Sequence, residues 1–333
     1  MATSESLGGD GGGAAGGGGG AEGDHRASIF DFFRSHTAYD MLPESGRVVL
    51  LDANVPAAAA FSIMAANEQL AAPVWDSNTD RYLGMLTPMD MMEQILHCCR
   101  EDCGMDCQTA MNSRDLNHLM TACPRPAGCP EATVDLRPDD DLMCVLRTFI
   151  RHDCRVLPVM DKEGTTQQLT PPLVGQVSRL LLFRFLYPPP PEYLRTLEGT
   201  LEDVGIGTHG RDKLVTAKIG DPVVDVMALM SRHSISGIPI IDDAGRLIDI
   251  YTDVDVLALV HFKVDIDVGQ ALEQARAGQV KTEQTCRTKD PLSEVVATFS
   301  KAKTTRLACL DDDGVVTGML TLVDLFKFLA GKS

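Results

Sequence analysis

The sequence lacks three features that would place it among nucleic-acid-binding, membrane or secreted proteins. Its 333 residues carry a formal net charge of -17, so no general electrostatic attraction draws the chain to nucleic acid or to an anionic membrane. No apolar run approaches the roughly 20 residues that cross a bilayer, and no basic start followed by an apolar block marks a secretion signal. We therefore expect a protein of the cytosol or nucleus, in which locally placed cations meet any bound phosphate.

Motifs that support catalysis are also missing. No Ser/His/Asp set, glycine-rich phosphate loop or paired-acid arrangement stands out, and the histidines are scattered singly along the chain. Glycine is concentrated in residues 1–27, but this stretch has almost no large apolar residues to offset the entropy cost of ordering. We predict that it forms a flexible tail and that the chain is not an enzyme.

Seven of the ten cysteines fall within residues 98–144. Without a secretion signal, reduced and partly buried thiols are the expected state. A zinc site is an alternative, because three of these cysteines have the i, i+4, i+8 spacing of one helix face and two more follow. The candidate ligands are Cys99, Cys103, Cys107, Cys123 and Cys129. Because the set contains no paired C-x-x-C motifs, we favour reduced thiols.

A helical pattern occurs four times in the sequence. Each copy has apolar residues at i, i+3, i+4 and i+7, which predicts a helix with one face in the core. The four sets are Ala57, Ala60, Phe61 and Met64; Leu142, Val145, Leu146 and Phe149; Val223, Val226, Met227 and Met230; and Leu292, Val295, Val296 and Phe299. Nine residues after each set, a matching position falls in a short apolar strand that ends in Asp. These positions are Pro73, Pro158, Pro239 and Ala308. The identical offset indicates an internal repeat.

The repeated unit has the order β-α-β-β-α, because each strand is followed by a turn, a second apolar strand and another helix. We predict an α/β (α+β) fold in which helices cover one side of a small sheet. The expected divisions are a tail (1–27), repeat one (28–110), repeat two (111–187), a Pro-rich linker (188–208), repeat three (209–265) and repeat four (266–333). The four prolines at 188–191 predict a stiff spacer, so repeats one and two should pack as one module and three and four as another.

Three copies carry a Thr and an Asp three residues apart where the second strand meets the final helix. The pairs are Thr87 and Asp90, Thr252 and Asp255, and Thr321 and Asp324. Each pair predicts a capping box for the helix. An Asp at the carboxyl end of a strand can also accept hydrogen bonds from the two vicinal hydroxyls of a ribose. The two interpretations are compatible, so the pattern also indicates nucleoside sockets.

The second copy departs from this pattern. Residues 176–179 are Gln-Val-Ser-Arg, and this alignment places Arg179 where the acid would be. An arginine cannot accept a hydrogen bond from a ribose. We expect the second socket to be empty or rebuilt.

The repeats resemble CBS (cystathionine β-synthase) domains, which pair into Bateman modules and commonly bind adenosine nucleotides between repeats. Four stretches are also similar to the gamma-subunit family of AMP-activated protein kinase: residues 34–43, 72–77, 201–208 and 245–251. The resemblance implies a disc of four repeats. It also implies binding of AMP, ADP or ATP, and a heterotrimer with a catalytic alpha subunit and a beta subunit.

The resemblance further implies roles for individual residues. The ribose acids would be Asp90, Asp255 and Asp324, beside Thr87, Thr252 and Thr321. Residues matching adenine- or ribose-lining positions are Val134, Thr208, Ile235 and Ser236. Phosphate-binding cations match poorly, because the family's basic positions carry Leu70, Val156, Ser178 and Thr305 here. The remaining candidates are Arg155, Arg276, Arg306 and Lys213.

The depleted cations leave two functions open. One is an energy-sensing regulatory subunit that reads nucleotides. The other is a scaffold that keeps the fold and the partner surfaces without reading nucleotides, in which Arg155 and Arg306 would form ordinary interface ion pairs.

Overall fold

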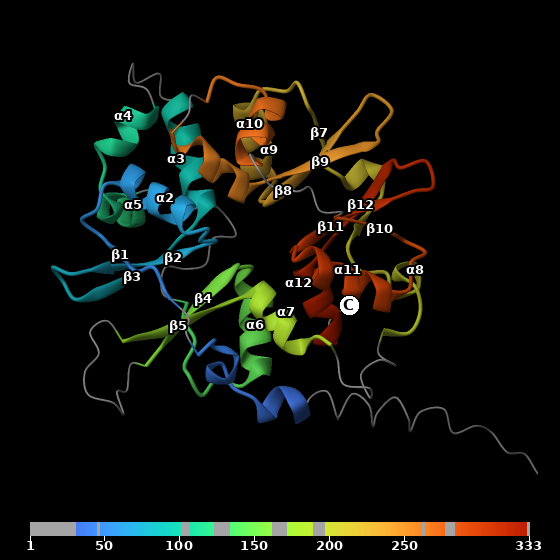
Figure 1. Cartoon of the computed structure of the whole chain (residues 1–333), viewed down its shortest axis with the longest axis horizontal. Helices are drawn as coiled ribbons and strands as arrows, with labels where there is room; N and C mark the ends of the chain where they lie inside the picture. The colour runs from blue at the N-terminus through green and yellow to red at the C-terminus, as the bar shows by residue number, and fades with distance from the viewer. Residues whose placement is uncertain are drawn as a thin grey trace, which may run out of the picture.

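Each of the four predicted repeats folds into a small sheet with helices packed on it, and the four units surround a common centre to form a disc (Figure 1). The structure is a computed structural model that describes residues 31–44, 47–100, 107–122, 134–161, 172–188, 197–261, 264–276 and 284–331. The predicted mixed α/β fold is confirmed. Within these residues, no helix is both long enough and apolar enough to cross a membrane.

The repeats share one order of elements. Repeat one contains β1 (Leu51–Asp52), α2 (Ala57–Ala66), β2 (Ala72–Asp76), β3 (Arg81–Leu86) and α3 (Pro88–Arg100). Repeat two contains α6 (Leu142–His152), β4 (Val156–Met160), β5 (Leu173–Ser178) and α7 (Arg179–Leu186). Repeat three contains β7 (Ala217–Lys218), α9 (Val223–His233), β8 (Gly237–Ile241), β9 (Leu247–Thr252) and the 3-10 helix η4 (Asp253–His261). Repeat four contains β10 (Thr285–Arg287), α11 (Leu292–Ala302), β11 (Arg306–Leu310), β12 (Val316–Thr321) and α12 (Leu322–Leu329).

The sheets repeat one strand arrangement. In repeats one, three and four the first strand pairs in parallel with the second, which pairs antiparallel with the third. In repeat two, a parallel bridge between Leu136 and Val159 takes the place of the first strand pair. The predicted apolar faces of α2, α6, α9 and α11 are all buried, as the helical spacing required.

The segment at the start of each repeat, here called its leading segment, packs on the other repeat of the same module. The two repeats of a module are therefore interlocked. Helix α5 (Leu116–Ala122), which precedes repeat two, bridges to the start of α2 through Asp115 and Pro56. Helix α8 (Leu201–Val204) bridges to the start of α11, and α10 (Val268–Ala275) bridges to the start of α9. Residues 31–44 meet α6 in the same manner. The stretch predicted as a linker, 188–208, therefore includes α8, which helps to complete repeat four.

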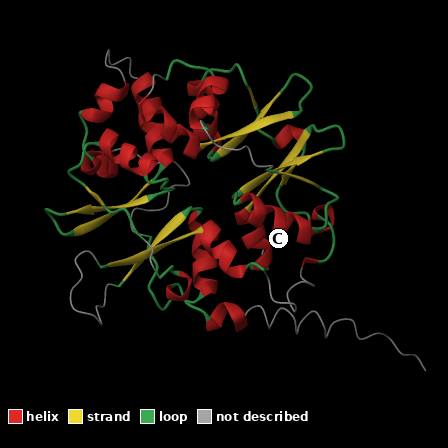
Figure 2. Ribbon diagram, in the orientation of Figure 1, coloured by secondary structure: helices red, strands yellow, loops and turns green. Residues whose placement is uncertain are grey.

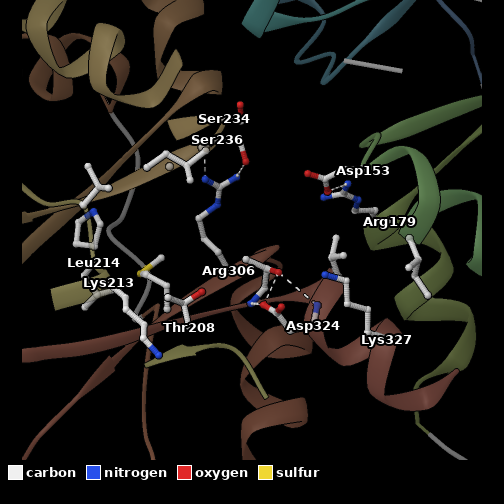
Figure 3. A pocket seen from close by; sticks show the side chains of 18 residues that line it. Asp153, Arg179, Thr208, Lys213, Leu214, Ser234, Ser236, Arg306, Asp324 and Lys327 are labelled. Atoms are coloured by element: carbon white, nitrogen blue, oxygen red, sulfur yellow. Dashed lines mark hydrogen bonds and ion pairs between the residues drawn. The ribbon is translucent and has the colours of Figure 1, made fainter. Parts of the chain in front are cut away.

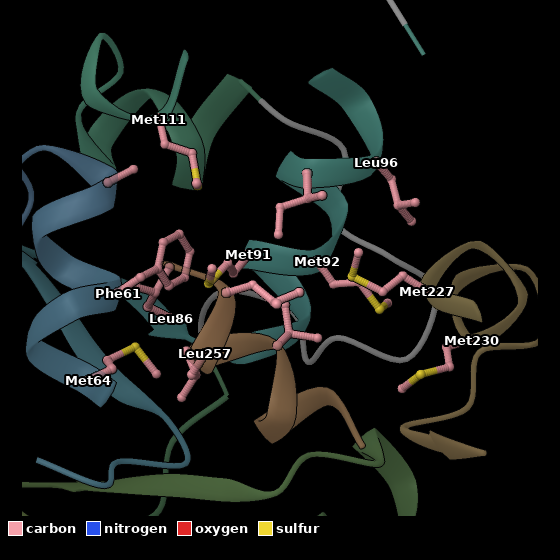
Figure 4. Close-up of a cluster of buried hydrophobic side chains, with 14 of the residues drawn as sticks. Phe61, Met64, Leu86, Met91, Met92, Leu96, Met111, Met227, Met230 and Leu257 are labelled. Carbon is pink, nitrogen blue, oxygen red and sulfur yellow. The ribbon is translucent and has the colours of Figure 1, made fainter. Parts of the chain in front are cut away.

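Two large buried clusters join the modules to each other. The first unites repeats one and three and is rich in methionine, including Met64, Met91, Met92, Met227 and Met230 (Figure 4). The second unites repeats two and four and contains phenylalanines that meet edge to face, for example Phe183 and Phe299 with ring centroids 6.1 Å apart. Figure 2 shows the consequence, with helices facing one another across the modules and sheets facing one another within them. The helix-to-helix contacts between modules were not predicted from the sequence.

Some predictions lie outside the described residues. The tail at 1–27 is one, and the proline spacer beyond Pro188 is another. Cys103, Cys123 and Cys129 of the zinc alternative also fall outside. Among the described side chains, no group of three or more His, Cys, Asp or Glu residues is arranged to hold a metal ion.

Candidate nucleotide-binding clefts

Three cavities lie where the last strand of a repeat meets its final helix. The Asp324 cavity (about 420 Å³) lies between repeats three and four and is lined by Thr208, Ser236, Arg306, Thr321 and Asp324, among others. The Asp255 cavity (about 350 Å³) is lined by Arg155, Thr252, Asp255, Arg276 and Arg306. The Leu181 cavity (about 310 Å³) is lined by Arg47, Gln69, Gln176, Leu181 and Arg184. Open sheets place ligand sites at such strand ends.

Each predicted Thr and Asp pair is hydrogen-bonded at the start of a final helix, and in repeats one and four the Asp backbone N–H donates back to the Thr hydroxyl. In repeat four, Asp324 Oδ2 accepts hydrogen bonds from Thr321 N (2.9 Å) and Thr321 Oγ1 (2.7 Å). Asp255 and Asp90 accept the same two bonds from Thr252 and Thr87, each at 2.7 Å. In all three copies both bonds go to Oδ2. The cap therefore fixes each carboxylate without using Oδ1, so capping and ligand binding are compatible.

The Asp324 cavity gathers seven of the residues selected from the sequence. They are Thr208, Lys213, Ile235, Ser236, Arg306, Thr321 and Asp324. Figure 3 shows Arg306 extending toward Ser236, with Asp324 and Lys327 on α12 and the Arg179–Asp153 pair on the other side. Three repeats contribute to this one cavity, because Arg179 comes from repeat two and Ser236 from repeat three. A ligand bound here would touch both modules.

The Asp255 cavity is rich in cations. Five basic side chains line it, and Asp255 is the only acidic residue among the described lining residues. The basic residues are Arg155, Arg179, Arg276, Lys303 and Arg306. Arg276 lies 3.6 Å from Asp255 Oδ2 and donates to the carbonyl of Ile250 at 2.9 Å. Burial raises the pKa of Asp255 above its ordinary value, with Arg276 opposing that shift.

Arg306 and Arg155 meet at the centre of the disc. Arg306 Nη1 and Arg155 Nη2 both donate to the carbonyl of Ser236, the latter at 3.3 Å, and Arg155 also pairs with buried Asp253. Desolvation, with the nearby Arg155 as the next cause, lowers the pKa of Arg306 to about 10, so Arg306 remains a cation at neutral pH. Arg155 thus forms the interface ion pair that the alternative interpretation expected, while still lining a cavity.

Gly237 makes room for this arrangement. A Cβ at this position would overlap the Arg306 guanidinium. The equivalent residue of repeat four is Arg306 itself, because Gly237 pairs with Thr252 just as Arg306 pairs with Thr321. Because Gly237 of repeat three has no side chain, the large Arg306 side chain of repeat four fits against it.

Comparisons with known proteins match the repeats individually and the chain as a whole. The CBS domain family matches residues 42–97, 206–262 and 279–331. The chain belongs to the CBS domain family. The second CBS repeat lies outside these matches but has the same strand pairing and helix order. A Methanocaldococcus jannaschii protein described as a proposed archaeal homologue of the AMP-activated kinase gamma subunit has the same fold, with a TM-score of 0.64 at 17% identity, covering 88% of this chain and 99% of that one.

The curated relatives of this CBS protein are kinase gamma subunits. The 5'-AMP-activated protein kinase subunit gamma of Kluyveromyces lactis is 29% identical over 308 residues, covering 91% of each chain. The Saccharomyces cerevisiae subunit is 28% identical, covering 91% of this chain and 92% of its own. Human subunit gamma-3 is 26% identical over 90% of this chain and 60% of its own length. The resemblance to the gamma-subunit family, with four CBS repeats in two Bateman modules, is confirmed.

The structure corrects the alignment of the second CBS repeat. Ser178 caps α7 by accepting a hydrogen bond from Leu181 N at 3.0 Å, which is the role of Thr321 toward Asp324 N. The strand register agrees, because Val156 pairs with Ser178 as Arg306 pairs with Thr321. The prediction that Arg179 occupies the acid's position is therefore wrong, and Leu181 stands there. The sequence alignment was displaced by two residues because Gln176 was matched to the capping threonine.

Arg179 instead lines two of the candidate clefts. It is 9% exposed, pairs with Asp153 at 2.6 Å and lines both the Asp324 and the Asp255 cavities. Desolvation lowers its pKa, and Asp153 opposes that shift. Lys303 and Lys327 are further cations that sequence reasoning missed. Lys327 could have been found, because it follows Asp324 by one helical turn.

A left-handed residue ends the first helix of every CBS repeat and lines a cavity. The four are Glu68, Asp153, Ser234 and Lys303, with φ between 47° and 52°. Non-glycine residues seldom adopt this conformation, and such residues cluster at binding sites. The repeated turn places Asp153 and Ser234 at the Asp324 cavity, Glu68 at the Leu181 cavity and Lys303 at the Asp255 cavity.

Three of the predicted site residues lie away from these cavities. Asp90 is 6% exposed and capped by Thr87, but neither residue is among the described lining residues of the three cavities. Val134 packs against the cluster that joins repeats two and four. A role for Thr87, Asp90 and Val134 in nucleotide binding stays a prediction.

Proposed function

We propose that the chain is a non-catalytic regulatory subunit of an AMP-activated-type protein kinase and that it binds AMP, ADP or ATP between its CBS repeats. Gamma-subunit relatives that align over nine-tenths of the chain support the regulatory role. On this proposal the chain acts with a catalytic alpha subunit and a beta subunit.

The observation that carries the nucleotide proposal is the composition of the Asp324 cavity. Asp324 lines this cavity and its cap bonds go to Oδ2, so Oδ1 can accept from both ribose hydroxyls. Arg306, Arg179 and Lys327 surround the same volume. A chain of net charge -17 that concentrates cations there supplies the local counter-charge that a phosphate needs.

The position of these cations suggests how binding reaches the rest of the molecule. Arg179 comes from repeat two and Arg306 from repeat four, and both are held by protein oxygens. A phosphate would offer each guanidinium a competing acceptor. Binding alters kinase activity only if the two activity states differ in affinity for the nucleotide.

Isothermal titration with AMP, ADP and ATP tests this proposal. Asp324→Ala should weaken binding about tenfold or more, since a hydrogen bond to a charged group is lost. Asp40→Ala is the matched control, because Asp40 accepts the same two capping bonds from Thr37 at 2.7 and 3.0 Å on the surface. Absence of binding at millimolar nucleotide, or equal effects of the two variants, contradicts the proposal.

A scaffold function is the second candidate. It is favoured by the engagement of Arg155 with Asp253 and of Arg306 with Ser236, which satisfies both guanidinium groups without a ligand. Reconstitution with kinase alpha and beta subunits separates the two functions. A stable complex whose kinase activity is unchanged by AMP would support the scaffold.

A further inference from the structure

The Leu181 cavity is the equivalent, in the first module, of the Asp324 cavity in the second. Each lies between the final helix of the even repeat and the strand and helix ends of the odd repeat. The strand registers and helix caps give the correspondence position by position. Equivalent pairs are Asp324 and Leu181, Val323 and Leu180, Arg306 and Val156, Lys327 and Arg184, and Lys213 and Arg47.

The inner part of the Leu181 cavity has lost the groups that suit a nucleotide. Leu181 cannot accept a hydrogen bond from a ribose, and Val156 cannot donate to a phosphate. Leu70 and Leu180 add further apolar surface to the lining. The floor of this cavity is therefore suited to an apolar group.

The outer part has kept its charge. Arg184 is placed as Lys327 is, one helical turn beyond the acid's position, and Arg47 is placed as Lys213 is, four residues before the first strand. Both arginines are exposed. Glu68, also exposed, is the one acidic residue among the described lining residues. Two forked guanidinium groups suit an oxyanion, which they can bind through paired hydrogen bonds.

A buried polar atom of a residue that lines the cavity lacks a hydrogen-bond partner. Gln176 Nε2 donates to Gln69 Oε1 at 3.0 Å, and Gln176 Oε1 is buried with no hydrogen-bond partner in the described structure. The equivalent residue in the Asp324 cavity is the apolar Met319. Unsatisfied buried acceptors are uncommon, so a turn of the Gln176 side chain that brings Oε1 to a donor on a ligand would be favoured.

We propose that the Leu181 cavity binds a small organic oxyanion with an apolar body, a single N–H or O–H donor and no vicinal diol. The anionic group meets Arg184 and Arg47, the apolar body lies on Leu181, Leu180 and Val156, and the donor meets Gln176 Oε1. This site adjoins the Asp255 cavity, with which it shares Leu70, Ser178 and Leu180, but the proposal does not depend on nucleotide binding. On this proposal, the socket of repeat two, which we expected to be empty or rebuilt, is rebuilt for a different ligand.

The probe for this site is indole-3-acetate, which combines a carboxylate, an apolar bicycle and one N–H. Titration by ligand-observed NMR on the full chain should show saturable binding at millimolar concentration. Indole-3-acetamide, which is neutral, should bind about tenfold more weakly, and 1-naphthylacetate, which lacks the N–H, should bind several-fold more weakly.

Two exposed substitutions test the arginines without disturbing the core. Arg184→Leu and Arg47→Leu should each weaken indole-3-acetate binding about tenfold and leave AMP binding unchanged. The equivalent Lys327→Leu should leave indole-3-acetate binding unchanged. A thermal unfolding scan checks that each variant is folded.

Saturating AMP distinguishes this proposal from the proposed function. Indole-3-acetate binding that persists under AMP supports a separate site. Displacement by AMP, absence of saturable binding, or indifference to both arginine substitutions overturns the inference, whatever the AMP titrations show.

Discussion

The two modules hold equivalent cavities and fill them with different chemistry. Around the Asp324 cavity the second module presents an acid and a buried arginine, whereas the first presents Leu181 and Val156 at the same positions. The backbone frame, the helix cap and the outer cation are common to both. The comparison shows that the caps and apolar faces of the CBS frame recur in both modules, while a few inward positions carry different residues.

The largest expected effect comes from making the second module resemble the first. Arg306→Val should lower nucleotide affinity about ten- to hundredfold, because a donor to the phosphate is lost. Arg246→Val is the control, since Arg246 pairs with Asp242 on the surface and lines none of the described cavities. Calorimetric titration with AMP measures both. Similar affinities for the two variants would show that Arg306 does not meet the ligand.

Next in size is the effect of a methyl group at Gly237. Gly237→Ala should lower the free energy of unfolding by about 1–3 kcal/mol, because the new Cβ overlaps buried Arg306. Repeat one carries Ala71 at this position, where Val156, the smaller equivalent of Arg306, packs in the same cluster. Gly220→Ala is the control, because nothing lies within 4 Å of a Cβ there. Equal denaturant midpoints for the two variants would contradict the packing described.

A smaller effect is expected from the caps, which should not distinguish the modules. Thr321→Ala and Ser178→Ala should each cost about 1 kcal/mol in unfolding free energy, because each hydroxyl accepts a backbone N–H at the start of a helix. Urea denaturation measures both. A large cost in only one module would mean that the frame is not shared.

The smallest expected effect is a pH dependence from Asp255. Burial raises the pKa of this carboxyl in the folded chain, so the folded state holds the proton more tightly than the unfolded state. The stability contribution is complete below the ordinary pKa of 3.8 and is lost as pH rises through the higher folded value. Asp255→Asn should remove this decline. If the unfolding free energies of the variant and the parent chain change equally with pH in that range, the raised pKa of Asp255 is contradicted.

Much of the fold was predictable because it depends on local periodicity. Spacing alone located the buried faces of all four first helices, and the Thr and Asp pairs marked three helix starts. The packing of each leading segment on the other repeat of its module was not predictable, because these contacts join residues far apart in sequence, such as Thr200 and Pro291. Arg179 was assigned to the acid's position because Gln176 was aligned with the capping threonine of the other repeats. The residue that caps the helix is Ser178, two positions later.

Site residues that lie within one repeat were predictable from the sequence. Contacts between site residues of different repeats were less predictable. Asp324 and Thr321 follow from one strand and helix. The convergence of Arg306, Arg179 and Ser236 depends on how three repeats surround the centre, which no single repeat encodes. Most of the cations at these cavities therefore come from neighbouring repeats.

The most direct test of the nucleotide assignment is a crystal structure of residues 28–333 soaked with AMP. We predict electron density in the Asp324 cavity, with the ribose hydroxyls on Asp324 Oδ1 and the phosphate against Arg306 or Arg179. Density for AMP only in other locations, or an empty cavity at saturating millimolar AMP, would contradict the account.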